Sequence, residues 1–119
     1  MSADPSFDEN RLERVRRYKN GPQLVGKLLE LFLEEGPARI AAARAGEQAR
    51  DFQAVVRAAH SLAPSAGNLG AVRLQQVADQ IQYLKDPDWD RIGGLLRELE
   101  DAFLTVKPRL EAEKKRGEG

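Results

Sequence analysis

The sequence has no cysteine and contains only one histidine, one methionine and one tryptophan in its 119 residues. The lack of cysteine excludes a disulfide scaffold, a thiolate nucleophile and every cysteine-ligated metal site. A zinc site would need several converging ligands, and there is no second histidine, so we expect no metal site. The remaining chemistry is that of oxygen groups and of the single imidazole, His60.

Net charge and long apolar runs are also missing. Nineteen basic residues balance nineteen acidic ones, so no global field would attract nucleic acid or an anionic membrane. No apolar stretch approaches the roughly 20 residues that cross a bilayer, and the first ten residues lack the basic and apolar regions of a signal peptide. We therefore expect a cytoplasmic protein that binds neither nucleic acid nor membrane.

The residues that are abundant favour helix. Hydrophobic residues make up 41% and charged residues 32% of the chain, with many Leu, Ala, Glu, Arg and Lys. A chain of this length can close one apolar core. The expected fold is all-α: a single domain over residues 1–119, built as an antiparallel four-helix bundle with a short additional N-terminal helix. Residues 1–6 and 112–119 are expected to be flexible because they are polar, charged or glycine-containing.

The first two helices are predicted from caps, breakers and apolar spacing. Asp8 can cap the short first helix, and the second runs from Pro22 to about Ala45. Pro37 interrupts the second helix, and we predict a kink there rather than an end. The apolar residues at spacings of three and four predict its buried face to be Leu24, Leu28, Leu31, Phe32 and Ile40.

Three further helices follow. The third begins after an Asp51 cap and ends in the Gly-Asn-Leu-Gly segment at 67–70. The fourth starts near Ala71, and Asp86-Pro87 stops it and caps the fifth. The buried face of the fifth is predicted to be Trp89, Ile92, Leu96, Leu99, Phe103, Val106 and Leu110. Short turns between long amphipathic helices favour antiparallel packing.

His60 falls at the flank of the buried face of the third helix, where an imidazole can be partly held and partly offered to a partner. The residues one and two turns ahead of it, Ala63, Pro64 and Gly67, are small, so they leave room for another surface. Pro64 stands inside a helix, where proline typically costs about 3 kcal/mol. Serines on the same helix cannot supply the geometry of a hydrolase, so that class is disfavoured.

Residues 59–71 read A-H-S-L-A-P-S-A-G-N-L-G-A, which closely resembles the A-H-S-L-K-G-S-A-G-N-L-G-A motif of histidine-containing phosphotransfer (HPt) domains. The two sequences differ only at Ala63 and Pro64. Similarity to the family continues at residues 7–8, 31–37 and 95–103, so it covers nearly the whole chain.

The resemblance implies that His60 carries a phosphoryl group, accepting it from and donating it to receiver-domain aspartates. Family members often place a glutamine on the following helix, where it hydrogen-bonds the imidazole, and Gln82 stands at that position. Ala63 replaces a lysine whose charge would offset the phosphoryl oxygens, and Pro64 replaces a glycine. Arg57, one turn before His60, is the candidate substitute cation.

The resemblance also implies the partners, a response-regulator receiver domain and a sensor histidine kinase, with this chain acting as a monomer. We expect no cofactor on the chain itself and place Mg²⁺ on the receiver. The sequence has no ATP-binding signature, so it should not phosphorylate itself. The partner is expected to dock on an apolar patch of Val56, Ala63, Pro64 and exposed residues of the second helix.

Two other interpretations stay open at this point. The substitutions at Ala63 and Pro64 would suit a degenerate, non-transferring adaptor that still docks receivers or kinases. A purely structural helical bundle would explain the apolar spacing but not the motif.

Overall fold

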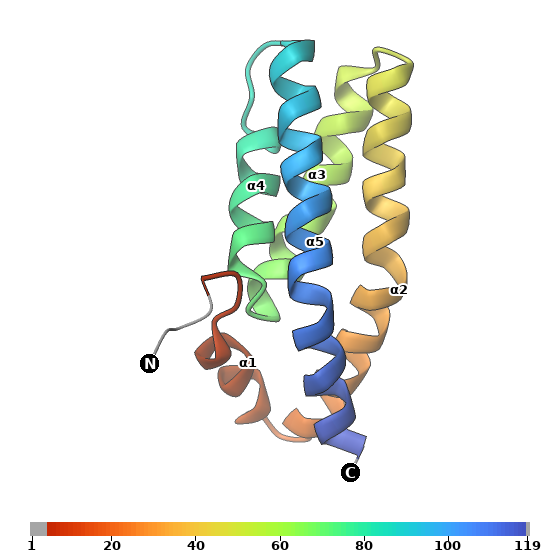
Figure 1. Ribbon diagram of the computed structural model, residues 1–119. Helices are drawn as coiled ribbons and strands as arrows, with labels where there is room; N and C mark the ends of the chain where they lie inside the picture. The colour runs from red at the N-terminus through yellow and green to blue at the C-terminus, as the bar shows by residue number, and fades with distance from the viewer. Residues whose placement is uncertain (1–4, 119) are drawn as a thin grey trace.

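A computed structural model describes residues 5–118 and contains five helices and no strand within that range (Figure 1). The helices are α1 (Glu9–Arg16), α2 (Gly21–Gln48), α3 (Phe52–Asn68), α4 (Val72–Gln82) and α5 (Trp89–Glu118). Helices α2 to α5 pack in chain order into an antiparallel bundle, in which α5 returns to contact α2. The predicted all-α bundle with a short N-terminal helix is therefore confirmed.

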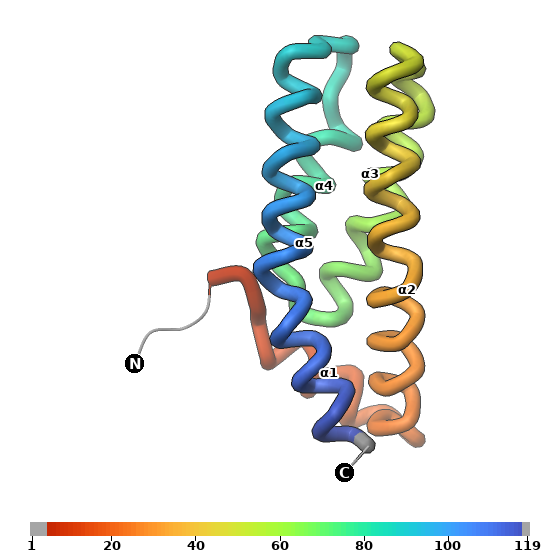
Figure 2. Tube along the Cα trace, turned by 45° about the vertical axis from the view of Figure 1, so that its right-hand side comes forward, coloured from red at the N-terminus to blue at the C-terminus, as the bar shows by residue number. Residues whose placement is uncertain are grey.

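The helices differ in length, and this difference shapes the lower end of the bundle. Figure 2 shows that α3 and α4 turn back part-way along the longer α2 and α5. The short α1 lies across the lower end, below the α3–α4 turn, where it contacts α2 and α3. Helix α1 thus covers core residues that α3 and α4 are too short to reach.

One continuous apolar cluster, to which all five helices contribute, forms the core. The rings of Phe32 and Phe103 join α2 to α5 with centroids 6.0 Å apart. Burying such side chains stabilises a fold by roughly 1.5–3 kcal/mol each. The predicted inward face of α5 is confirmed, with Trp89 half-buried and the following residues fully buried: Ile92, Leu96, Leu99, Phe103, Val106 and Leu110.

The predicted buried face of α2 is partly wrong. Leu24 and Leu31 are exposed to 40% and 38%, and Leu28 is only half-buried. The face that enters the core is turned by one residue, and its members are Val25, Leu29, Phe32, Ile40 and Ala43. The segment from residue 24 to 33 is apolar over more than half of its circumference, so spacing alone did not distinguish the two faces. Helix α2 passes Pro37 without ending.

Aspartates begin three of the helices. The side chains of Asp8 and Asp51 accept hydrogen bonds from the backbone N–H groups of Asn10 and Ala54, so both predicted caps are confirmed. For α5 the predicted cap is wrong. Asp88, rather than the Asp86-Pro87 pair, accepts the N–H of Arg91 at 3.1 Å, because α5 begins only at residue 89.

The α3–α4 turn is closed by Gly70, whose φ of +84° suits glycine. Its N–H donates to the carbonyl of Gly67 at 3.2 Å, and the N–H of Ala71 donates to the carbonyl of Ala66 at 2.8 Å. This pair of bonds is the Schellman arrangement of a helix end. The carbonyl of Gly70 accepts the N–H of Asp8 at 2.7 Å, which attaches the N-terminal segment to the turn.

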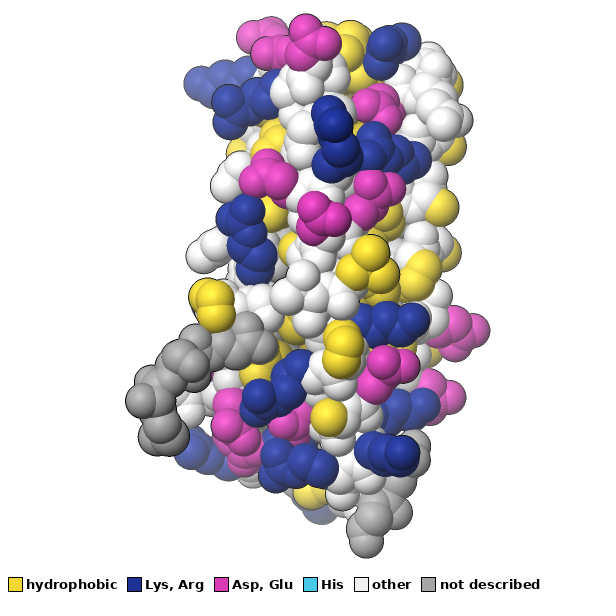
Figure 3. Space-filling model, in the orientation of Figure 1, with side chains coloured by type: hydrophobic (Ala, Val, Ile, Leu, Met, Phe, Trp, Pro, Cys, Tyr) yellow, Lys and Arg dark blue, Asp and Glu magenta, His cyan; other side chains and the backbone are white. Residues whose placement is uncertain are grey.

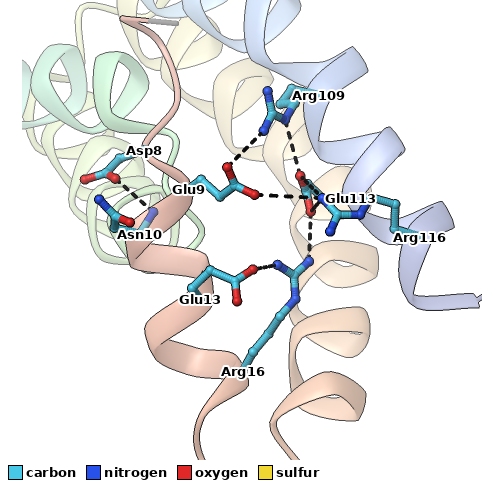
Figure 4. Close-up of polar contacts among 8 residues, drawn as sticks. All are labelled: Asp8, Glu9, Asn10, Glu13, Arg16, Arg109, Glu113 and Arg116. Atoms are coloured by element: carbon cyan, nitrogen blue, oxygen red, sulfur yellow. Dashed lines mark hydrogen bonds and ion pairs between the residues drawn. The ribbon is translucent and has the colours of Figure 1, made fainter. Parts of the chain in front are cut away.

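The structure describes part of each end that was predicted to be flexible, and the flexibility itself stays a prediction. Residues 1–4 and 119 lie outside the described residues, but Ser6 is buried and α5 continues to Glu118. The buried carboxylate of Glu113 accepts hydrogen bonds from Arg16, Arg109 and Arg116 (Figure 4). This network joins α5 to α1 and gives the last turns of α5 a reason to stay helical.

The surface matches the balanced charge of the sequence. On the face that Figure 3 shows, basic and acidic side chains alternate and do not gather into a large patch of one sign. Among residues 5–118, no helix is long and apolar enough to cross a membrane.

Candidate functional site

His60 lies on the outer surface of α3, near the middle of the helix. Its side chain is exposed, whereas Ala59, the preceding residue, and Ala63, one turn later, are buried at 0% and 3% exposure. The helix therefore presents the imidazole to solvent from a backbone that is fixed by core packing. This position agrees with the predicted flank of the buried face.

The imidazole is held from the neighbouring helix. Nδ1 of His60 lies 2.7 Å from Oε1 of Gln82, which is the last residue of α4. Helices α3 and α4 are antiparallel partners, so residues far apart in sequence become neighbours across their interface. The contact predicted between Gln82 and His60 is thus present, and it leaves Nε2 as the outward-facing nitrogen of the ring.

A third residue fixes the direction of the Gln82 amide. The Nε2 group of Gln82 donates to Oδ1 of Asp79 at 2.7 Å, one turn back on α4. A carboxylate only accepts hydrogen bonds, so it requires the amide nitrogen on its side. Oε1 must then face His60, and Nδ1 must carry the proton that it accepts. Sequence reasoning missed Asp79, although its place three residues before Gln82 on one helix was a usable signal.

The small residues near His60 differ in their exposure. Ala63 is buried, so the prediction that it lines an exposed docking patch is wrong; its methyl group points from the three-four stripe into the core. Gly67 is also buried, and an added Cβ there would lie 2.7 Å from the Gln75 amide. Pro64 is exposed, and it gives the carbonyl of His60 no N–H partner at the usual helical position.

Arg57 is exposed on the turn before His60, the position expected of a substitute cation. The hydroxyl of Ser61 donates to the Arg57 carbonyl at 3.1 Å and so is held along the helix. The role of Arg57 as a cation for phosphoryl oxygens stays a prediction.

An apolar surface begins beside His60 and crosses from α3 to α2. Pro64 lines one groove together with Leu24, Leu28 and the exposed ring of Tyr18, and Arg11, Arg14, Asn68 and Gln75 give the same groove a polar part. A second groove, between α2 and α3, includes Leu31. Val56, one turn before His60, is half-buried. The docking patch stays a prediction: its candidates are Val56, Pro64, Leu24 and Leu31, with Tyr18 added and Ala63 removed because it is buried.

Among residues 5–118 no group of three or more histidine and carboxylate side chains is placed to hold a metal ion. Gln82 holds the imidazole of His60, and apolar side chains such as Pro64 lie one turn away on the same surface. Such a site can offer a ring nitrogen to an incoming electrophile.

Comparison with known proteins identifies the family. The model of the Hpt domain family matches residues 27–112. The chain belongs to the Hpt domain family. It is similar over 96% of its length to the histidine-containing phosphotransfer protein B (HptB) of Pseudomonas aeruginosa PAO1, with a TM-score of 0.83 and 25% identity over 98% of that chain. Hpt domains are phosphotransfer carriers, and this chain has a histidine phosphotransfer role in phosphorelays.

A second similar structure is the histidine-containing phosphotransfer domain of ArcB from Escherichia coli, with a TM-score of 0.77 and 26% identity. That match covers 92% of this chain and 93% of the ArcB domain. The aerobic respiration control sensor protein ArcB of Escherichia coli (strain K12) is 29% identical over 84 residues, or 70% of this Hpt chain. The chain spans only 11% of the length of that relative.

Proposed function

We propose that His60 is the phosphoryl acceptor and that Nε2 is the reacting nitrogen. The observation that carries this proposal is the 2.7 Å contact between Nδ1 of His60 and Oε1 of Gln82, made while the ring stays exposed. The contact engages one nitrogen as a donor and leaves the lone pair of the other directed outward. A neutral imidazole held in this way is a ready nucleophile.

The partner of this reaction is a receiver-domain aspartyl phosphate. The Nε2 lone pair attacks phosphorus, an N–P bond forms, and the P–O bond to the aspartyl carboxylate breaks with its electron pair leaving on that oxygen. The ring then keeps the Nδ1 proton and carries positive charge, which Oε1 of Gln82 faces. The reverse step returns the group, so the domain is a carrier that needs no ATP site of its own.

We propose that the receiver, rather than this chain, supplies the Mg²⁺ for this transfer. The described residues hold no carboxylate cluster near His60, whereas Mg²⁺ prefers carboxylate and phosphate oxygens. A receiver that contributes Mg²⁺ and an aspartate would complete the site. A sensor histidine kinase is the expected origin of the phosphoryl group, and ArcB, a sensor protein, is a relative of this chain.

Docking is proposed to use the apolar surface of Tyr18, Leu24, Leu31, Val56 and Pro64. An apolar centre beside His60 would exclude water from the transferring group, while the polar rim keeps the interface easy to release. We expect a small, weak interface and a domain that works as a monomer.

The decisive experiment uses His60→Gln. Glutamine preserves an exposed polar side chain on α3, so the helical content and the thermal midpoint should change little, while phosphorylation by a cognate phospho-receiver should be lost. The measurement is acid-labile, base-stable incorporation of radiolabelled phosphate, with circular dichroism on the same samples. Transfer that continues in this variant would refute His60 as the acceptor.

The adaptor interpretation is favoured by one observation, the absence of the family lysine at buried Ala63. An adaptor would bind receivers through the same apolar surface but incorporate no label. A wild-type chain that binds a phospho-receiver in a shift-mapping experiment, yet never becomes labelled, would support it over the carrier.

A further inference from the structure

The contacts of Asp79 point to a role that lies beyond holding α4 together. Asp79 is in the last turn of α4, where a negative charge interacts unfavourably with the negative end of the helix dipole. Its carboxylate is half-buried and accepts the Gln82 amide at 2.7 Å. Asp79 is thus unfavourable for its own helix but is placed where it contacts the residue that holds His60.

The explanation lies in the symmetry of a glutamine amide. An amide can present either its oxygen or its NH₂ group to a neighbour at similar distance. If the NH₂ faced His60, Nδ1 would have to accept, and the proton would move to Nε2, the nitrogen that must attack. Nδ1 can donate a hydrogen bond only if the amide oxygen of Gln82 faces it. Asp79 favours that orientation because its carboxylate accepts the NH₂ group of the same amide.

We propose that Asp79 is a positioning residue that holds the Gln82 amide in one orientation and thereby keeps His60 in the tautomer with Nδ1 protonated and Nε2 free. This inference rests on the proposed use of Nε2 as the acceptor. The hydrogen bond that links Asp79 to the site comes from the Gln82 amide, so Asp79 would act through Gln82.

The same chain of contacts serves the transferred state. When the N–P bond forms, the ring becomes cationic and Nδ1–H becomes a stronger donor to Oε1 of Gln82. The carboxylate of Asp79 polarises the amide in the sense that makes Oε1 more negative, so it favours the charged ring. The charge therefore supports phosphohistidine without lying beside the phosphoryl oxygens.

The test reads the tautomer directly by ¹⁵N nuclear magnetic resonance. The chain has a single histidine, so all imidazole signals belong to His60. At about pH 8, where an ordinary imidazole is neutral, the wild type should show one protonated nitrogen, Nδ1. Asp79→Ala should shift the signals toward a mixture of the two tautomers and lower the rate of phosphoryl transfer by about tenfold, the scale expected for loss of an orienting partner.

Two further variants make the role of Asp79 specific. Asp101→Ala removes an exposed carboxylate from α5 and should leave both the tautomer and the transfer rate unchanged. In a Gln82→Glu background a carboxylate accepts from Nδ1 with either oxygen, so Asp79 has nothing left to orient. There, Asp79→Ala should no longer alter the tautomer, an outcome that a merely structural role of Asp79 would not produce.

The outcomes separate this inference from the proposed function. A wild-type tautomer that is unchanged by Asp79→Ala would overturn the positioning role even if transfer to His60 proceeds. Signals that respond to Asp79→Ala in a chain that never accepts phosphate would uphold the positioning role and refute the carrier function. An Nε2-protonated wild type would overturn the inference outright.

Discussion

At the scale of single residues, backbone geometry and side-chain direction decide what the site can do. Gly70 is the clearest case, because its positive φ and its contact with the N-terminal segment both exclude a side chain. A Cβ on this residue would lie 2.3 Å from the carbonyl oxygen of Asp8. The turn that Gly70 closes also sets where α4 starts, and hence where Gln82 lies relative to His60.

We therefore expect Gly70→Ala to lower the free energy of unfolding by about 1–3 kcal/mol, the usual cost of a strained backbone position. Urea denaturation followed by circular dichroism measures this loss. Gly94→Ala is a matched control, because an added Cβ there meets nothing within 4 Å, and it should stabilise α5 by about 0.5–1 kcal/mol. Equal effects of the two substitutions would contradict the role of the turn.

The sequence predicted the individual site residues unevenly. His60 and Gln82 were found because a motif and a fixed spacing mark them, and the contact between them is present. The exposure of Ala63 was predicted wrongly, because small residues fit both a core and an open surface. Asp79 was missed because its spacing of three residues from Gln82 places it beside that amide but is equally compatible with a solvated aspartate.

At the scale of elements, α2 and α3 together build the apolar surface beside His60. Pro64 on α3 and Leu24 on α2 line the same groove. Both side chains are exposed, so a charge on either one can be accommodated without disturbing the core.

Pro64→Glu should strongly reduce transfer from a phospho-receiver while preserving the fold. A carboxylate at the centre of the interface would have to lose its hydration when the partner docks, which is costly without a counter-charge. We expect at least a tenfold loss in apparent affinity, equivalent to about 1.4 kcal/mol. Titration of a labelled receiver measures it.

Leu104→Glu provides the matched control for this prediction. Leu104 is 65% exposed on α5 and lines the groove between α2 and α5 rather than the surface beside His60. Its replacement should leave receiver binding unchanged. If Leu104→Glu weakened binding and Pro64→Glu did not, the docking surface would have to be moved to the α2–α5 face.

The elements themselves were predictable where the sequence has one clear apolar stripe. Helix α5 agrees with its predicted face because charged and polar residues occupy most of the rest of its circumference. Helix α2 was harder, since two adjacent apolar stripes gave equally regular spacing. In the bundle one stripe enters the core, whereas Leu24 and Leu31 remain for the surface beside His60.

At the scale of the whole molecule, Glu113 connects the two ends of the chain. Arg16, 97 residues earlier, donates to its carboxylate at 2.8 Å. Burial by itself would raise the pKa of the Glu113 carboxyl, but the hydrogen bonds from Arg16 and Arg109 and the charge of Arg116 outweigh burial and lower it. No sequence pattern predicts such a distant pairing, so the last turns of α5 were expected to fray.

The lowered pKa makes this contact dependent on pH. A carboxyl whose folded pKa lies below its ordinary value of 4.5 stabilises the fold above that value and loses its contribution as the pH falls through the folded pKa. The pKa of Glu100 is lowered in the same direction, mainly by its hydrogen bond from Arg44. The fold should therefore weaken in acid below about pH 4.5.

Glu113→Gln should lower the free energy of unfolding by about 2 kcal/mol at neutral pH, because charged hydrogen bonds are replaced by weaker ones. The difference from wild type should shrink as the pH falls through the lowered pKa of the Glu113 carboxyl. Urea denaturation across this pH range measures the trend. The exposed Glu111 gives a control, Glu111→Gln, for which we expect little change at any pH. A difference in unfolding free energy between wild type and Glu113→Gln that stays constant with pH would contradict the stabilising role of the Glu113 carboxylate.

The single exposed imidazole of His60 limits how many partners the domain can serve at one time. On the proposed function, every donor and every acceptor must reach the same exposed ring of His60 across the same apolar surface, and two partners cannot occupy it together. Partners then compete by mass action, so the abundance of one receiver alters the supply of phosphoryl groups to another. The stoichiometry of the partners, as much as the state of any sensor, would set the direction in which phosphate flows.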